Sequence, residues 1–113
     1  MSAYLFIKTK ITDPNRYQEY VKAVRPFAEK FGSRYLVRSY PVEVLEGDPS
    51  QWGNFCLLVS EFPSAAVARD FWRSQDYAEI RALRKDAGDV HVVLAEELPS
   101  DPSEAVRIVP HLE

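Results

Sequence analysis

Cysteine is almost absent from this sequence: Cys56 is the single one, so no disulfide bond can form within the chain. Its position in an apolar run favours a small buried side chain over a reactive thiol. Long apolar runs are also missing, since the longest, residues 55–59, is far short of the roughly 20 residues that a membrane-spanning helix needs. Residues 1–11 lack the layout of a signal peptide, so we expect a cytoplasmic protein.

A strong excess of either charge is lacking as well. The chain has 14 Lys and Arg against 17 Asp and Glu, a formal net charge of -3, and the basic residues are spread along it. Phosphate backbones are recognised by clustered positive charge, so we expect neither a nucleic-acid nor a membrane partner.

The common catalytic and metal-binding motifs are missing too. There is no glycine-rich phosphate loop, nucleophile elbow or nucleotide fingerprint. The two histidines, His91 and His111, have no spacing to Cys56 that suits a metal, so we expect no metal site and no cofactor. His91 could act as an acid or base near neutral pH, but a hydrogen-bonded strand histidine is the alternative.

What is present is an ordinary globular composition. The chain has 113 residues, of which 46% are hydrophobic and 27% charged, a size and balance typical of one domain with a packed core.

The first third of the chain reads as a strand followed by a helix. Residues 4–11 alternate with a period of two, which predicts a β-strand. Residues 12–14, Thr-Asp-Pro, are a helix-start signal, and Gly32 is a natural helix stop. Between them, apolar residues recur at spacings of three and four, and Pro26 among them is expected to bend the helix or divide it in two.

Two more strands follow. Residues 33–40 read as a second strand, which residues 42–45 could continue beyond a break at Pro41. Residues 46–53 are rich in turn formers. Residues 55–62 form a nearly continuous apolar strand, which predicts burial on both faces, with helices on one side and a second subunit on the other.

The last third repeats the helix and strand. A helix capped near Ser64 is expected to meet a second helical piece at Ser74, which runs toward Gly88, and residues 90–97 alternate as the last strand. We therefore expect a domain over residues 1–97. Residues 98–113 are predicted to be an extension that either lies on a partner subunit or is disordered.

The predicted element order is βαββαβ, which describes an α+β, ferredoxin-like fold with an antiparallel sheet of strand order 4-1-3-2. The first and third strands are central in that order, which agrees with their stronger apolar character.

Over residues 3–97 the sequence resembles the small bacterial proteins grouped as the domain of unknown function thirteen-thirty, within the dimeric α/β barrel superfamily. The resemblance rests on the order and spacing of residues along the chain: Asp13, Pro14, Tyr17, Tyr20, Phe31, Gly32, Arg38, Glu46, Gly47, Glu61, Phe62, Pro63, Ser74, Tyr77, Leu83 and Arg84. The sequence departs from the pattern at Ser39 and Tyr40, where such proteins often have glycines, and these side chains could narrow a cleft.

The resemblance implies a homodimer whose two sheets face one another. It implies chemistry less clearly, because the wider superfamily includes cofactor-free monooxygenases, haem enzymes and simple binding domains.

Five residues are candidate ligand contacts: Arg38, Glu61, Ser74, Tyr77 and Arg84. Arg38 and Glu61 lie on neighbouring predicted strands, where they could orient a ligand or form a structural ion pair. Arg84 could bind a ligand carboxylate through its planar fork, or pair with Glu61 or a helix end. Ser74 and Tyr77 could donate hydroxyl hydrogen bonds into a cavity, but Ser74 is equally explained as a helix cap.

Two functions are compatible with this pattern. One is a dimeric protein that binds a small organic molecule in a cleft between sheet and helices and acts as a cofactor-independent enzyme of monooxygenase type. The other is a non-catalytic structural or interaction module, associated with stress responses.

Overall fold

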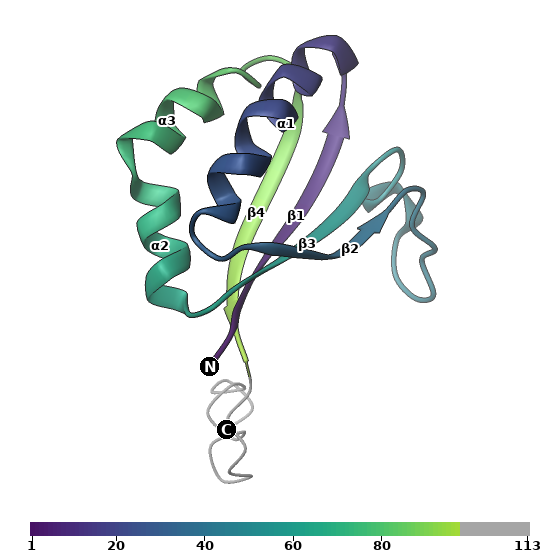
Figure 1. Cartoon of the computed structure of the whole chain (residues 1–113). Helices are drawn as coiled ribbons and strands as arrows, with labels where there is room; N and C mark the ends of the chain where they lie inside the picture. Colours follow the sequence, from purple (N-terminus) through teal and green to yellow (C-terminus); the bar gives the residue numbers. More distant parts are fainter. Residues whose placement is uncertain (98–113) are drawn as a thin grey trace, which may run out of the picture.

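The computed structural model describes residues 1–97. Its elements are β1 (Ala3–Ile11), α1 (Pro14–Glu29), β2 (Arg34–Ser39), the 3-10 turn η1 (Pro49–Gln51), β3 (Cys56–Phe62), α2 (Ala65–Arg73), α3 (Gln75–Ala82) and β4 (Gly88–Glu96). The strands form an antiparallel sheet of order β2-β3-β1-β4, which confirms the predicted fold and strand order (Figure 1). The predicted extension over residues 98–113 lies outside the described residues.

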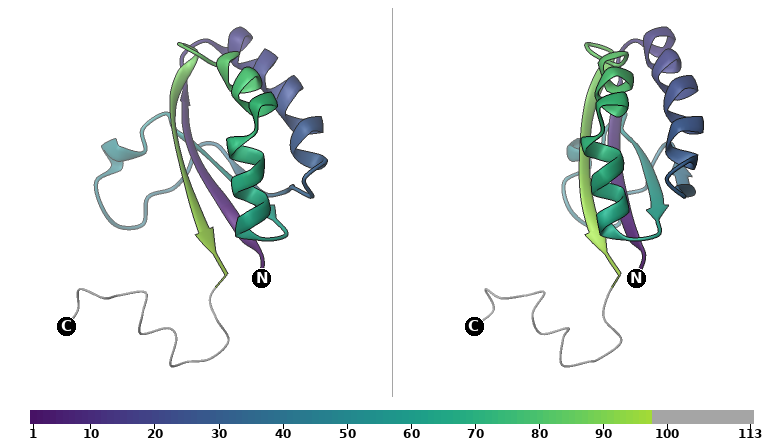
Figure 2. Two further views of the ribbon diagram at one scale, coloured as in Figure 1. Left: turned by 90° about the vertical axis from the view of Figure 1, so that its left-hand side faces the viewer. Right: turned by 60° about the vertical axis from the view of Figure 1, so that its left-hand side comes forward.

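The three α-helices all lie against the same face of the sheet. The connection between β2 and β3 lies on the opposite side, as Figure 2 shows when the sheet is viewed nearly edge-on. The alternation of β1 decides which side chains meet the helices: Leu5 is buried under them, whereas Phe6 points to the other face and is 40% exposed.

Helix α1 begins and ends at the predicted signals. The Asp13 side chain accepts a hydrogen bond from the Arg16 backbone N–H at 3.1 Å, and Pro14 occupies the first turn. Gly32 follows the helix with φ +80, and a Cβ there would lie 2.8 Å from Cγ of Pro63, so both backbone and space require glycine. Pro26 does not divide α1, because it lies close to the helix end and removes only one late hydrogen bond.

Ser74 separates α2 from α3, as the sequence predicts. Its hydroxyl accepts a hydrogen bond from the Tyr77 backbone N–H at 3.1 Å and donates one to the Phe71 carbonyl at 2.9 Å. One side chain therefore supplies a hydrogen-bond partner to a backbone carbonyl at the end of α2 and to a backbone N–H at the start of α3.

Strand β2 differs from its prediction at its far end. It stops at Ser39, and residues 42–45 do not continue it, because the chain turns at Pro41 toward η1. A register shift between Tyr35 and Val37 leaves Leu36 as an extra residue. This β-bulge changes which side chains of β2 face the helices.

An aromatic cluster fills the helix–sheet interface where α2 meets α3. The Phe71 ring lies 4.5 Å from the Tyr77 ring and 5.2 Å from the Phe62 ring, measured between centroids. These side chains are at most 3% exposed, so this part of the interface is closed to water.

Candidate functional site

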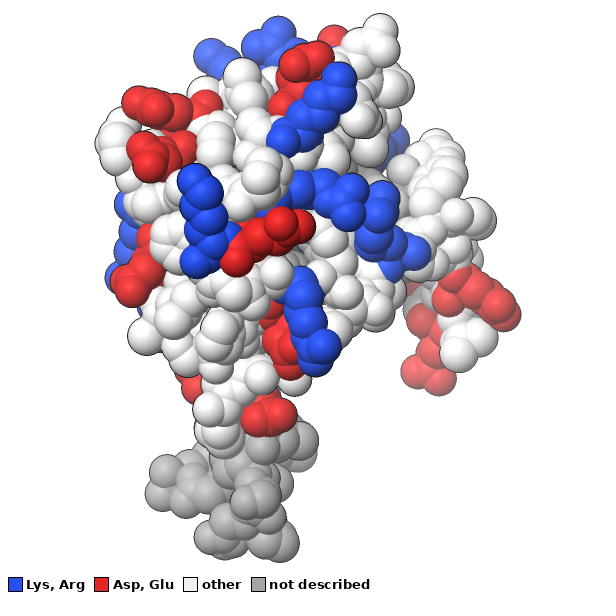
Figure 3. Space-filling model, in the orientation of Figure 1, with Lys and Arg blue, Asp and Glu red and all other residues white. Residues whose placement is uncertain are grey.

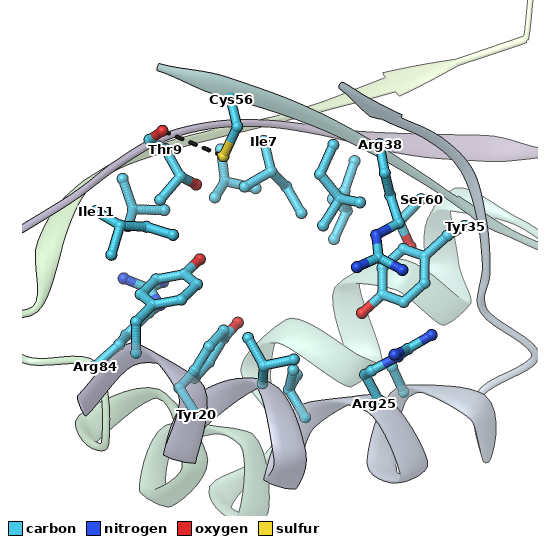
Figure 4. Close-up of a pocket in the computed structure, with 18 of the residues that line it drawn as sticks. Ile7, Thr9, Ile11, Tyr20, Arg25, Tyr35, Arg38, Cys56, Ser60 and Arg84 are labelled. Atoms are coloured by element: carbon cyan, nitrogen blue, oxygen red, sulfur yellow. Dashed lines mark hydrogen bonds between the residues drawn. The ribbon is translucent and has the colours of Figure 1, made fainter. Parts of the chain in front are cut away.

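A pocket of about 460 Å³ opens between α1 and the helix-facing side of the sheet (Figure 4). This volume suits a small organic molecule. The pocket is lined by Leu5, Ile7, Thr9, Ile11, Pro14, Tyr17, Gln18, Tyr20, Val21, Val24, Arg25, Ala28, Tyr35, Arg38, Ser39, Tyr40, Cys56, Leu57, Leu58, Ser60, Phe71, Trp72, Tyr77, Arg84, Val90 and Val92. It therefore lies beside the aromatic cluster, with Phe71 and Tyr77 shared between them.

The middle of the pocket is apolar. Leu5 and Ile7 come from β1, and Val21 and Val24 face them from α1. These side chains recur every two residues in the strand and every three in the helix, so each element presents them on one face. The surface between the polar ends offers van der Waals contact but no charge.

One end of the pocket is built around Arg84, which follows α3 and is half-buried. Its guanidinium carbon lies 5.1 Å from the centre of the Tyr20 ring, and the hydroxyls of Tyr20 and Tyr77 are 2.9 Å apart. Nε of Arg84 is buried and has no hydrogen-bond partner within residues 1–97. A buried donor without a partner is rare in folded proteins, so the hydrogen-bonding capacity of the Arg84 guanidinium is not fully used within the described residues.

Near neutral pH, Arg84 is protonated and the tyrosines at this end of the pocket are neutral. Burial opposes the charge of Arg84, but the Tyr77 and Tyr20 hydroxyls favour it, and its pKa is raised overall. Burial and the proximity of Tyr77 raise the pKa of Tyr20 far above its ordinary value. Burial also raises the pKa of Tyr17, although a hydrogen bond with Thr9 acts in the opposite direction. The arginine is a permanent cation, and these tyrosines are hydrogen-bonding groups rather than bases.

The other end of the pocket combines Arg25 of α1 with Tyr35 and Arg38 of β2 (Figure 4). The guanidinium carbon of Arg25 lies 5.4 Å from the centre of the Tyr35 ring. Burial raises the pKa of Tyr35, against the opposing effect of Arg25 and Arg38. The bulge at Leu36 makes this grouping possible, because residues three apart in a regular strand would point to opposite faces.

The charge of the pocket lining is one-sided. Arg25, Arg38 and Arg84 are among the lining residues, and no Asp or Glu of the described chain is. None of the three arginines forms a salt bridge within residues 1–97, where Arg34 and Arg69 do. On the molecule's surface, a row of basic side chains crosses the middle of the face seen in Figure 3, with acidic side chains beside it.

The sequence-predicted site residues separate into two groups. Arg38, Tyr77 and Arg84 line the pocket, and their binding of a ligand stays a prediction. Glu61 and Ser74 are not lining residues, and Ser74 acts as the helix cap described above.

The pairing of Arg38 with Glu61 was predicted from neighbouring strands, and the observed partner is different. Register places Arg34 opposite Glu61, and these two form the ion pair, while Arg38 lies opposite Leu58. Arg34 also lowers the pKa of Glu61. Since Ser60 faces the pocket, the next side chain along β3, Glu61, points to the other face.

Sequence reasoning missed Arg25 and the role of Tyr20 and Tyr35. The usable signal was Arg25 itself, which lies four residues after Val21 on the apolar side of α1. A charged side chain on such a stripe indicates a polar site under the helix. The sequence places Tyr20 in the first predicted helix and Tyr35 in the second predicted strand, and neither position by itself marks a pocket.

The described part of the chain contains no group of three or more His, Cys, Asp or Glu side chains that could hold a metal ion. Within residues 1–97, no helix combines the length and the apolar character needed to cross a membrane.

Residues 2–98 match the family model described as "Domain of unknown function (DUF1330)". The chain belongs to the DUF1330 family. No curated protein is similar enough in sequence to count as a relative of this DUF1330 protein.

Solved structures support the fold of this DUF1330 protein. Methylated RPA0582, a protein of Rhodopseudomonas palustris, matches with a TM-score of 0.67 and 18% identity, over 88% of this chain and 82% of that one. SnoaB, a cofactor-independent oxygenase from Streptomyces nogalater, matches with a TM-score of 0.61 and 7% identity, over 89% and 97%. A dimeric ferredoxin-like protein of unknown function from Jannaschia sp. CCS1 matches with a TM-score of 0.60 and 12% identity, over 86% and 100%. At these identities the likeness establishes the ferredoxin-like fold and no activity.

Proposed function

We propose that this DUF1330 protein is a homodimer in which each subunit binds a small organic molecule between α1 and the sheet. The observation that carries the proposal is the pocket itself, which is apolar in the middle and has Nε of Arg84 buried without a partner at one end. A cavity kept only for packing would leave no buried cationic donor without a partner.

The open face of the sheet supports the homodimer. Phe6 is 40% exposed, Val37 40% and Val93 61%; Phe6 and Val37 flank the buried Val59, and Val93 lies beside Phe6 on β4. Pairing this face with a second copy would cover those apolar side chains. The Jannaschia protein of the same fold is dimeric. Because the pocket lies on the helix side, such a dimer leaves it accessible.

Substitutions on the open face test the homodimer. Phe6→Glu and Val93→Glu place charges on the proposed interface and should convert a dimer of the 13.0 kDa chain into a monomer in light scattering. Leu83→Glu is the control, because Leu83 is 41% exposed and lies beside the helices. A wild-type monomer at micromolar concentration, or a dimer that survives both charged variants, would contradict the proposal.

Thermal melting in the presence of a diverse small-molecule library tests ligand binding. A ligand that binds the folded state at about a hundred times its Kd stabilises the protein by about 2.7 kcal/mol, which raises the melting temperature measurably. We expect the rise to shrink in Arg84→Gln and to persist in Glu61→Gln, whose carboxylate lies away from the pocket. If Arg84→Gln changes only the melting temperature of the free protein and leaves the ligand-induced rise intact, the residue is structural.

Cofactor-independent oxygenation is the second candidate function, favoured by the cationic end of the pocket. Arg84 could stabilise an enolate or phenolate oxygen, a type of carbanion equivalent that reacts with oxygen directly. Within residues 1–97 the pocket lining holds no carboxylate and no histidine to remove a proton. The substrate would therefore be a phenol or enol that ionises readily, and oxygen consumption with such compounds tests this activity.

The competing interpretation is a structural or interaction module that binds no small molecule. It predicts that no compound raises the melting temperature and that filling the pocket leaves every property of the protein unchanged.

A further inference from the structure

The chemical class of the ligand follows from the charges at the two ends of the pocket. Arg84 lies at one end, and Arg25 and Arg38 lie at the other, across the apolar middle (Figure 4). No acidic side chain of the described residues lines the space between them. A neutral ligand would leave all three cations without a counter-charge, whereas an anion at each end would supply one.

Each end of the pocket offers hydrogen-bond donors and no negatively charged side chain. At the first end these are the guanidinium of Arg84 and the linked hydroxyls of Tyr20 and Tyr77, one of which can donate onward into the pocket. At the second end they are the guanidinium groups of Arg25 and Arg38, with the Tyr35 hydroxyl, which is pictured pointing inward (Figure 4). Planar guanidinium forks match the two oxygens of a carboxylate.

The lining between the two ends and the start of α1 disfavour phosphorylated ligands. Leu5, Ile7, Val21 and Val24 line it, so the body of the ligand must be apolar. Phosphorylated compounds are usually held by backbone N–H groups at a glycine-rich turn before a helix. The helix that lines this pocket starts instead with Asp13 and Pro14, of which the first is acidic and the second has no N–H.

We infer that the pocket binds an elongated organic dianion, with a carboxylate or equivalent acidic group at each end of an apolar body. This inference rests on the proposed function, since it names the ligand class of the same site. One carboxylate contacts Arg84, and the second contacts Arg25 and Arg38.

Calorimetric titration with straight-chain dicarboxylates tests the inference. Adipate, azelate and dodecanedioate vary the distance between the two acids, while nonanoate lacks one acid of azelate and azelamide lacks both charges. We expect the best-fitting dicarboxylate to bind about ten- to a hundredfold more tightly than its matched monoacid and diamide. Added salt should weaken the dicarboxylate more than the monoacid.

Arginine variants assign the two ends. Arg84→Gln should weaken dicarboxylate binding about ten- to a hundredfold, and the double variant Arg25→Gln with Arg38→Gln somewhat less, because both of its arginines are exposed. In each variant the affinity for the monoacid should fall less than the affinity for the dicarboxylate. Arg69→Gln is the control, since Arg69 lies outside the pocket and faces Glu96. Arg84→Lys keeps the charge and serves if the glutamine variant does not fold.

The outcomes separate this inference from the proposed function. If azelamide or nonanoate binds as tightly as every dicarboxylate, the dianion inference is wrong and the binding function stands. If neither the dicarboxylates nor a neutral library binds to the folded wild-type protein, both are wrong.

Discussion

The space between helices and sheet is closed in one region and hollow in the adjoining one, although the same elements border both. Where α2 meets α3, Phe62, Phe71 and Tyr77 pack ring against ring and exclude water. Beside the middle of α1, Ile7 and Val21 both line the pocket. The buried side chains of the closed region are uncharged, whereas the lining of the hollow one includes arginine at both ends. The comparison teaches that tight packing in the aromatic region coexists with an unfilled space beside it in the same helix–sheet layer.

Truncating the aromatic cluster should have the largest effect on stability. Phe71→Ala removes a ring that is 3% exposed and should lower the free energy of unfolding by about 3–5 kcal/mol. The matched variant Ile7→Ala enlarges a space that already exists and should cost about 2 kcal/mol or less. Urea unfolding at fixed protein concentration measures both. Equal losses would show that the two regions do not differ in packing.

Adding volume should again destabilise the aromatic region more than the pocket. Val21→Phe extends a ring into the pocket and should change the free energy of unfolding by no more than about 1 kcal/mol while abolishing ligand binding. Ala68→Leu adds volume beside the aromatic cluster, where Ala68 is 1% exposed, and should cost about 1–3 kcal/mol. Urea unfolding and calorimetry distinguish the two variants. A strongly destabilised Val21→Phe protein would mean that the pocket is not open in solution.

The smallest effect is expected at Glu61, outside both regions. Arg34 lowers its pKa in the folded state, so the stabilisation is present above the unfolded pKa, about 4.3, and is lost as the pH falls through the folded value. The stability difference between wild type and Glu61→Gln should therefore shrink when urea unfolding is repeated at pH values below about 4. The difference is small at neutral pH too, because Arg34 is largely exposed. A difference that grows on acidification would contradict the sign of the pKa shift.

Periodicity and capping residues were enough to predict the fold. The alternation of β1, the Asp13-Pro14 start of α1 and the division at Ser74 are all local signals, and the structure has each of them. The order of the strands follows from the order of the elements, so it too could be predicted.

The pairing of side chains across strands could not be predicted from the same signals. Arg38 faces the pocket with Tyr35 only because a bulge inserts Leu36, and nothing local in the sequence marks that position. For the same reason the sequence could not decide which arginine meets Glu61. The hollow beside Val21 is also invisible, because apolar residues have the same spacing whether the helix packs tightly on the sheet or stands away from it.

Methyl NMR of the wild-type protein gives the most direct test of whether the pocket binds a small organic molecule. The methyl signals of Ile7, Val21 and Val24 would be followed during separate titrations with azelate, nonanoate and azelamide. Binding in the pocket predicts that at least one of these compounds shifts all three residues and leaves Val37 and Val93, on the open face of the sheet, unchanged. If none of the compounds moves the pocket methyls, or if the shifts are confined to Val37 and Val93, the account is contradicted.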